Sequence, residues 1–91
     1  MKIVWDRDKA SANRKKHKGV TFEEAKEVLY DPFALTREDY DASGEQRFVT
    51  LGIGGKGRVL VVAYTYREEA IRLISAWKAN EPQRRRYEKQ F

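Results

Sequence analysis

Side chains that can bind an anion and carry a proton recur near the start of the chain. A helix that begins after Asp6 places four of them on one face: Lys9, Asn13, Lys16 and His17. The last three lie four, seven and eight residues after Lys9, which are spacings that share a helix face. The imidazole of His17, the only histidine, can exchange a proton close to neutral pH. Alternatively, His17 complements the negative end of the helix dipole. The face as a whole predicts an anionic ligand, most simply a phosphate backbone.

A second group of polar residues interrupts an apolar segment near the other end of the chain. Arg72 and Ser75 lie within the run 71–79, where a half-buried arginine requires a polar or charged partner. Three more arginines, whose guanidinium groups can bind phosphate through two parallel hydrogen bonds, lie on or beside the expected strands: Arg47, Arg58 and Arg67. For Arg72 the alternative is a structural ion pair with Glu45 or Asp39.

Length and composition limit what the chain can be. Its 91 residues carry a net charge of +5 and give a pI near 9.6, which permits nucleic-acid binding without establishing it. The absence of cysteine excludes disulfides and thiolate metal sites, and a single histidine argues against a histidine-rich metal site. Because the longest apolar stretch is far too short to span a membrane and no apolar signal segment is present, we expect one cytoplasmic domain over residues 1–91.

Hydrophobic periodicity and capping residues outline the elements that must position these groups. Asp6 is the expected N-cap of a first helix, and Thr21 with Glu24 matches a capping box for a second. Glycines within residues 54–57 predict a hairpin whose second strand, apolar on both faces, is central in the sheet. The expected elements are a strand over 1–5, helices over 7–17 and 22–30, a strand over 33–36, an acidic loop over 37–46, strands over 47–53 and 58–66, and a helix that starts at Asn80.

Residues 68–79 fit two structures. Five apolar residues form a helical stripe: Ala70, Ile71, Leu73, Ile74 and Trp77. Three of them, Ile71, Leu73 and Trp77, also fall on one side of a strand. Periodicity alone favours the helix.

The chain resembles the BrnT family, the toxin half of a type II toxin–antitoxin pair. The residues that match the family occur in the same order along nearly the whole chain. The matching residues are Trp5-Asp6, Lys9, Asn13, Lys16-His17, Gly19-Val20, Phe22, Ala25, Asp31-Pro32, Gly44-Glu45, Arg47, Gly52, Arg58, Leu60-Val61-Val62, Thr65, Arg67, Ile71-Arg72, Ile74-Ser75-Ala76, Lys78-Ala79, Glu81 and Tyr87-Glu88. The resemblance implies a small α+β, RelE-like domain, in which an antiparallel sheet of about four strands is packed with two N-terminal helices and a C-terminal helix. It also implies that residues 70–78 form a strand.

Two positions depart from the family pattern. Lys18 lengthens the spacing between His17 and Gly19, and Trp77 stands where an arginine usually follows Ser-Ala. The second departure removes a cation from the expected site but offers an aromatic surface on which a base can stack. It therefore leaves the activity of this chain open.

The resemblance implies a metal-independent endoribonuclease that cleaves RNA, inhibits translation and growth, needs no cofactor, and is neutralised by a cognate BrnA-like antitoxin, through which it reaches operator DNA. Such cleavage requires a proton acceptor, a proton donor and cations around the phosphorane. Lys9, Glu45 or Tyr87 could complement His17 in proton transfer. The expected catalytic residues are His17, Arg47, Arg67, Arg72 and Tyr87, and the expected substrate-binding residues are Lys9, Asn13, Lys16, Arg58, Ser75 and Trp77.

A non-catalytic function is the alternative. The chain could be a module that binds nucleic acid, or a partner of the antitoxin that co-regulates their operon. Tyr87 and Phe91 also fit packing residues of the last helix, and Asn13 could cap or cross-link backbone. A binding module would show salt-dependent affinity for nucleic acid without forming product.

Overall fold

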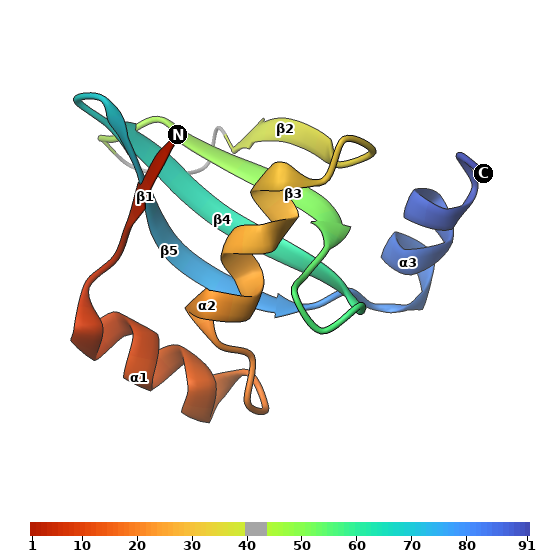
Figure 1. The fold of residues 1–91 in the computed structure, drawn as a ribbon, viewed down its shortest axis with the longest axis horizontal. Helices are drawn as coiled ribbons and strands as arrows, with labels where there is room; N and C mark the ends of the chain where they lie inside the picture. The colour runs from red at the N-terminus through yellow and green to blue at the C-terminus, as the bar shows by residue number, and fades with distance from the viewer. Residues whose placement is uncertain (40–43) are drawn as a thin grey trace.

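A computed structural model describes residues 1–39 and 44–91 of the chain, which form an α+β fold with helices packed on a five-stranded sheet (Figure 1). In chain order the elements are β1 (Lys2–Val4), α1 (Arg7–Lys16), α2 (Phe22–Ala25), the 3-10 helix η1 (Lys26–Tyr30), β2 (Leu35–Asp39), β3 (Arg47–Ile53), β4 (Val59–Arg67), β5 (Ala70–Lys78) and α3 (Glu81–Glu88).

The sheet is larger than expected and is mixed. Its strand order is β1-β5-β4-β3-β2, with β4 in the centre as predicted. Strands β2 to β5 pair antiparallel, but β1 lies parallel to β5, with Ile3 opposite Ile71. The prediction of an antiparallel sheet of about four strands was therefore wrong at one edge, because β1 pairs with the last strand, distant in sequence.

Residues 70–78 form strand β5, so the helix that periodicity favoured is wrong and the implied strand is confirmed. A register shift opposite Ala63 and Tyr64 leaves Ile74 as an extra residue in β5. This bulge places Leu73 and Ala76, three residues apart, in the same core cluster. The bulge thus imitates helical spacing within a strand. Pairing with β4 along the strand, and with β1 at Ala70, Ile71 and Arg72, satisfies backbone groups that a helix would otherwise have satisfied.

The N-terminal helices begin at the predicted caps. Asp6 Oδ1 accepts hydrogen bonds from the backbone N–H groups of Asp8 (2.7 Å) and Lys9 (3.3 Å). Thr21 Oγ1 accepts one from the N–H of Glu24 at 3.0 Å. The second helical segment is only four residues of α-helix followed by η1, so the predicted second helix is correct in place and partly 3-10 in geometry.

Two predicted boundaries differ from the structure. β2 covers Leu35–Asp39 rather than residues 33–36, because Asp31 Oδ1 accepts a hydrogen bond from the N–H of Phe33 and holds the preceding residues in a turn. The predicted acidic loop over 37–46 therefore begins as a strand, and its residues 40–43 lie outside the described residues.

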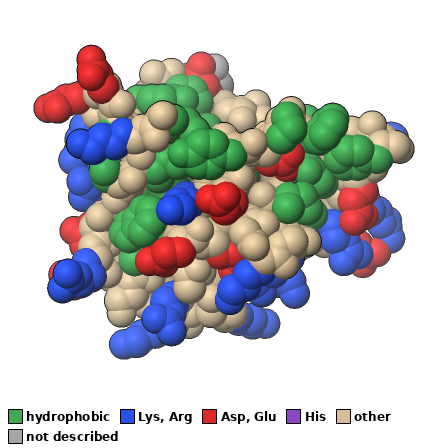
Figure 2. Space-filling model, in the orientation of Figure 1, with side chains coloured by type: hydrophobic (Ala, Val, Ile, Leu, Met, Phe, Trp, Pro, Cys, Tyr) green, Lys and Arg blue, Asp and Glu red, His purple; other side chains and the backbone are tan. Residues whose placement is uncertain are grey.

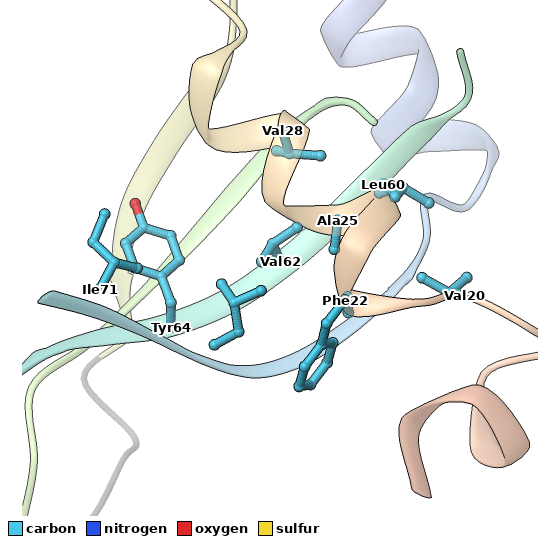
Figure 3. Packing of buried hydrophobic residues seen from close by; sticks show 10 residues of the cluster. Val20, Phe22, Ala25, Val28, Leu60, Val62, Tyr64 and Ile71 are labelled. Atoms are coloured by element: carbon cyan, nitrogen blue, oxygen red, sulfur yellow. The ribbon is translucent and has the colours of Figure 1, made fainter. Parts of the chain in front are cut away.

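The main core lies between the sheet and the N-terminal helical segments. Ala25 and Val28 from α2 and η1 lie over Leu60 and Val62 of β4, as Figure 3 shows. Trp5 packs edge-on against Phe22, with ring centroids 5.9 Å apart. We call this side of the sheet the helix face.

The opposite side of the sheet carries a second cluster and is called here the arginine face. Its centre is Val49, Leu51 and Val61. Helix α3 packs against one end of it through Tyr87, and a complete capping box fixes the start of α3, in which Asn80 and Gln83 each accept a backbone hydrogen bond from the other.

Positive charge is not confined to one side. Figure 2 shows the helix face, where Lys and Arg side chains gather over α1 at the lower left and around α3 at the right. Among the described residues, no helix has both the length and the apolar character needed to cross a membrane.

Candidate functional site

Arg47 and Arg72 lie on either side of Thr65 on the arginine face. Arg72 is opposite Thr65 in the β4–β5 register, and the Thr65 hydroxyl donates a 2.6 Å hydrogen bond to the carbonyl oxygen of Gln46, next to Arg47. Since neighbouring strands are about 4.8 Å apart, the Cα atoms of the two arginines are roughly 10 Å apart. Their long side chains can converge above Thr65, which is itself 1% exposed.

Arg67 completes a triangle with these two arginines. It lies two residues beyond Thr65 on β4 and thus on the same face. Its Nη2 is 3.3 Å from Oε2 of Glu45, and both side chains are substantially exposed. An ion pair this exposed is weak, so Arg67 can exchange Glu45 for a phosphate at little cost.

Arg47 has an unsatisfied donor. Its Nε is buried but makes no hydrogen bond to any described residue. A buried donor without a partner costs about 1–3 kcal/mol, so a side-chain movement that brings Arg47 to an anion would remove this cost. We call Arg47, Arg67 and Arg72, with Glu45, the arginine group.

Asp6 is the acidic neighbour of Arg72. Its carboxylate caps α1, and the pKa of Asp6 is lowered mainly by the N–H groups of Asp8 and Lys9 and to a smaller extent by the charge of Arg72. Arg72 is half-buried and forms no ion pair with a described residue within 4.0 Å. The structural pair with Glu45 or Asp39 that the sequence left open is thus not formed among the described residues.

His17 lies away from the arginine group. It is the C-cap of α1, and its ring centroid is 5.8 Å from that of Trp77. Trp77 is five residues from Arg72 along β5, a separation of roughly 16 Å. A phosphate held by Arg72 is therefore out of reach of His17, and the structure supports a structural position for His17 at the helix end.

Asn13 is buried and joins α1 to the edge of β5. Its Nδ2 donates to the carbonyl oxygens of Val20 (3.0 Å) and Ala76 (2.9 Å), and its Oδ1 accepts from the N–H of Ala76 at 3.0 Å. The hydroxyl of Ser75 donates to the same Oδ1 at 3.3 Å. Both predicted substrate-binding residues are thus used within the protein, whereas Lys9 and Lys16 are exposed on α1.

Arg58 forms a bidentate pair with Glu24 away from the arginine group. Its Nε and Nη2 donate to the two carboxylate oxygens at 2.5 and 2.8 Å, and the side chain of Glu24 is only 1% exposed. The hydrogen bonds from Arg58 lower the pKa of Glu24 despite burial, which acts the other way. This arginine balances a buried carboxylate and is not placed to bind RNA together with Arg47.

Tyr87 is also used inside the protein. It is 4% exposed, and its hydroxyl donates a hydrogen bond to Asp31. Burial, and then this hydrogen bond, raise the pKa of Tyr87 to about 12. A buried phenol with this pKa is poorly suited to proton transfer near neutral pH.

A cavity of about 370 Å³ lies between the centre of the arginine face and α3. Its lining includes three residues that sequence reasoning did not select, Arg37, Gln83 and Arg86. Arg37 lies two residues after Leu35 on β2, so both side chains are on the same face of the sheet. The predicted strand ended at residue 36 and therefore did not include Arg37. Arg86 stands in a run of three arginines, and only the position of α3 shows which of them faces the sheet.

The described residues contain no group of three or more His, Cys, Asp or Glu side chains positioned to hold a metal ion.

Comparison with known proteins identifies a family and a similar solved structure. The model of the family described as "Ribonuclease toxin, BrnT, of type II toxin-antitoxin system" matches residues 5–82. The crystal structure of the Brucella abortus ribonuclease toxin BrnT is similar, with a TM-score of 0.65 and 23% sequence identity, over 89% of this chain and 99% of that chain. At this identity the structural likeness shows the fold alone. No curated protein matches the sequence significantly.

Proposed function

Because this chain belongs to the BrnT family of ribonuclease toxins from type II toxin–antitoxin systems, we propose that it is a metal-independent endoribonuclease that cleaves RNA at the arginine group. In this proposal it acts in the cytoplasm, where RNA cleavage inhibits translation and growth. A cognate BrnA-like antitoxin neutralises it and links it to operator DNA. We further propose that the fold is RelE-like.

The placement of Arg47 and Arg72 around Thr65 is the observation that supports this proposal most. Two guanidinium groups can hold the non-bridging oxygens of one phosphate, and Arg47 has an Nε that no described residue engages. Charge grows on these oxygens as the 2′-oxygen attacks phosphorus. Fixed cations therefore stabilise the phosphorane more than the substrate.

Glu45 is the group that we propose for proton transfer, in place of His17 and Tyr87. It lies beside Arg67 and is partly exposed, so it can reach a substrate held on the arginine face. The carboxylate would take the proton of the 2′-hydroxyl while the bond from phosphorus to the 5′-oxygen breaks. The 5′-oxygen would take up a proton from solvent, leaving a cyclic phosphate and a 5′-hydroxyl.

The test is cleavage of end-labelled RNA by the purified protein in excess EDTA. We expect cleavage by the wild type and a loss of roughly 10²- to 10³-fold in Arg47→Ala or Arg72→Ala, the size of effect seen when one such donor is removed. Arg84→Ala, on the exposed side of α3, removes the same charge elsewhere and should cleave normally. Intact RNA after incubation with folded wild type would reject the proposal.

Glu45→Gln separates chemistry from binding. It should lower kcat with little change in KM, because the amide cannot accept the proton. A change in KM alone would instead assign Glu45 to positioning of Arg67.

A non-catalytic RNA-binding module is the second candidate function. It is favoured by the separation of the arginine group from His17 and by the burial of Tyr87. This function predicts RNA affinity that falls steeply with salt concentration, with no product at any incubation time.

A further inference from the structure

We propose that the cavity between the arginine face and α3 is a nucleobase subsite for RNA, with Trp77 as its stacking wall. The inference rests on the proposed function for its substrate class. It adds a second binding position, distinct from the phosphate position at Arg47 and Arg72.

The lining of the cavity has the composition that a nucleobase requires. Its floor is apolar and is formed by Val49, Leu51 and Val61, and its rim carries Trp77. Flat aromatic bases bind such surfaces through stacking and apolar contact.

The charges at the rim favour a nucleotide over an apolar side chain of a protein partner. Arg37 and Arg86 line the cavity, and no Asp or Glu does so among the described residues. An apolar peptide side chain would leave both guanidinium groups without an anion. A nucleotide brings its own phosphates to them while its base fills the floor.

Gln83 adds a polar contact with a fixed direction. Its Oε1 accepts a 2.9 Å hydrogen bond from the N–H of Asn80 in the capping box, which holds the side chain against the start of α3. The Nε2 is not used in that capping box. It can donate a hydrogen bond to an acceptor on the edge of a bound base.

Trp77 is held in place before a ligand arrives. It is opposite Val61 in the β4–β5 register, and the ring of His17 lies 5.8 Å from it at an interplanar angle of 36°. A wall fixed in this way loses little side-chain entropy when a base stacks on it.

The cavity and the arginine group share strand β3. Arg37 is opposite Val49, and Arg47 precedes Val49 by two residues on the same face of β3. Two residues along a strand span roughly 7 Å. An RNA whose phosphate is bound at Arg47 thus has an adjacent base within reach of the cavity.

The test compares adenosine 5′-monophosphate with ribose 5-phosphate, which carries the phosphate but no base. Kd values from ¹⁵N-NMR titrations should show tighter binding of the nucleotide by roughly 5- to 150-fold, the range expected for one stacked base. Trp77→Ala should abolish this preference, and Trp77→Phe should keep most of it. Tyr66→Ala, which removes an exposed aromatic ring outside the cavity, should behave as wild type.

Charge variants of the rim give an independent readout. Arg37→Gln and Arg86→Gln should raise the Kd values of both ligands by the same factor. Arg84→Gln, on the same helix as Arg86 but outside the cavity, should leave both Kd values unchanged. Equal binding of the two ligands by wild type, or a preference that survives in Trp77→Ala, would overturn the subsite.

RNA cleavage separates this inference from the proposed function. Cleavage by wild type without a preference for the nucleotide rejects the subsite and leaves the nuclease intact. A preference that depends on Trp77, in a protein that never cleaves RNA, supports the subsite and rejects the nuclease. Should both hold, Trp77→Ala is expected to alter which positions of an RNA are cut.

Discussion

Tyr87 and Asp31 connect the C-terminal helix to the segment that precedes β2. The hydroxyl of Tyr87 donates to Asp31 Oδ2, which also accepts a 2.9 Å hydrogen bond from the N–H of Ile53. Burial would raise the pKa of Asp31, but its three hydrogen bonds together lower it. The connection holds α3 against the sheet, and with it the two α3 residues of the cavity rim, Gln83 and Arg86.

Tyr87→Phe should lower the free energy of unfolding by about 1–3 kcal/mol, because Asp31 loses a donor in a partly buried site. Urea denaturation followed by circular dichroism measures the change. Tyr30→Phe removes a hydroxyl from an exposed tyrosine and should be neutral. If Tyr87→Phe kept full stability but lost RNA cleavage, Tyr87 would have to be returned to the catalytic group.

The same pair predicts a stability change at alkaline pH. The pKa of Tyr87 is about 12 in the folded protein and near 10 when unfolded. Below pH 10 both states hold the proton. Between pH 10 and 12 only the unfolded state releases it, so wild type should lose up to about 3 kcal/mol of stability across this window. Since Tyr87→Phe lacks this group, its stability curve should converge on that of wild type as the pH rises, and parallel curves would argue against the raised pKa.

Arg58→Ala should cost about 3 kcal/mol of stability, because it leaves the buried carboxylate of Glu24 without its partner. The matched control is Arg67→Ala, which breaks the exposed pair with Glu45 and should cost less than about 1 kcal/mol. Thermal and urea denaturation would measure both. Weakened RNA binding by a fully stable Arg58→Ala variant would instead restore the predicted substrate role of Arg58.

Asn13→Ala should be destabilising by about 2–4 kcal/mol, because it removes the hydrogen-bond partner of Ala76 N–H and of two carbonyl oxygens. Asn13→Asp should cost at least as much, since a carboxylate cannot donate to those carbonyls. The neighbouring exposed substitution Ser11→Ala should stay within about 0.5 kcal/mol. Unfolding midpoints in urea would decide between this role and substrate binding, which predicts normal stability with weaker RNA affinity.

Much of the fold could be predicted from local signals. The caps at Asp6, Thr21 and Asn80 each mark a helix start in the structure, because a capping side chain acts on backbone within three residues of it. The glycine-rich turn at 54–57 likewise marks the β3–β4 hairpin. Local signals could not predict the parallel pairing of β1 with β5, because it joins residues nearly 70 positions apart.

The candidate site was predictable only in part. Arg47, Arg67 and Arg72 do share one face of the sheet, since alternation within a strand fixes the side on which each residue lies. The sequence could not show that Arg58, with the same chemistry, is paired with Glu24, because that pair joins residues 34 positions apart. The position of His17 beside Trp77 likewise follows from how α1 docks on β5 and not from its helical spacing.

The contact between Asn13 and Ala76 also covers part of the open edge of β5. β1 pairs with only the first three residues of β5, so the backbone of β5 beyond Arg72 faces an unfilled edge of the sheet. The side-chain amide of Asn13 occupies the place of a further peptide group there and engages both the N–H and the carbonyl of Ala76. An extended segment from another molecule would have to displace Asn13 to pair at Ala76, so this contact disfavours strand addition at that point of the β5 edge.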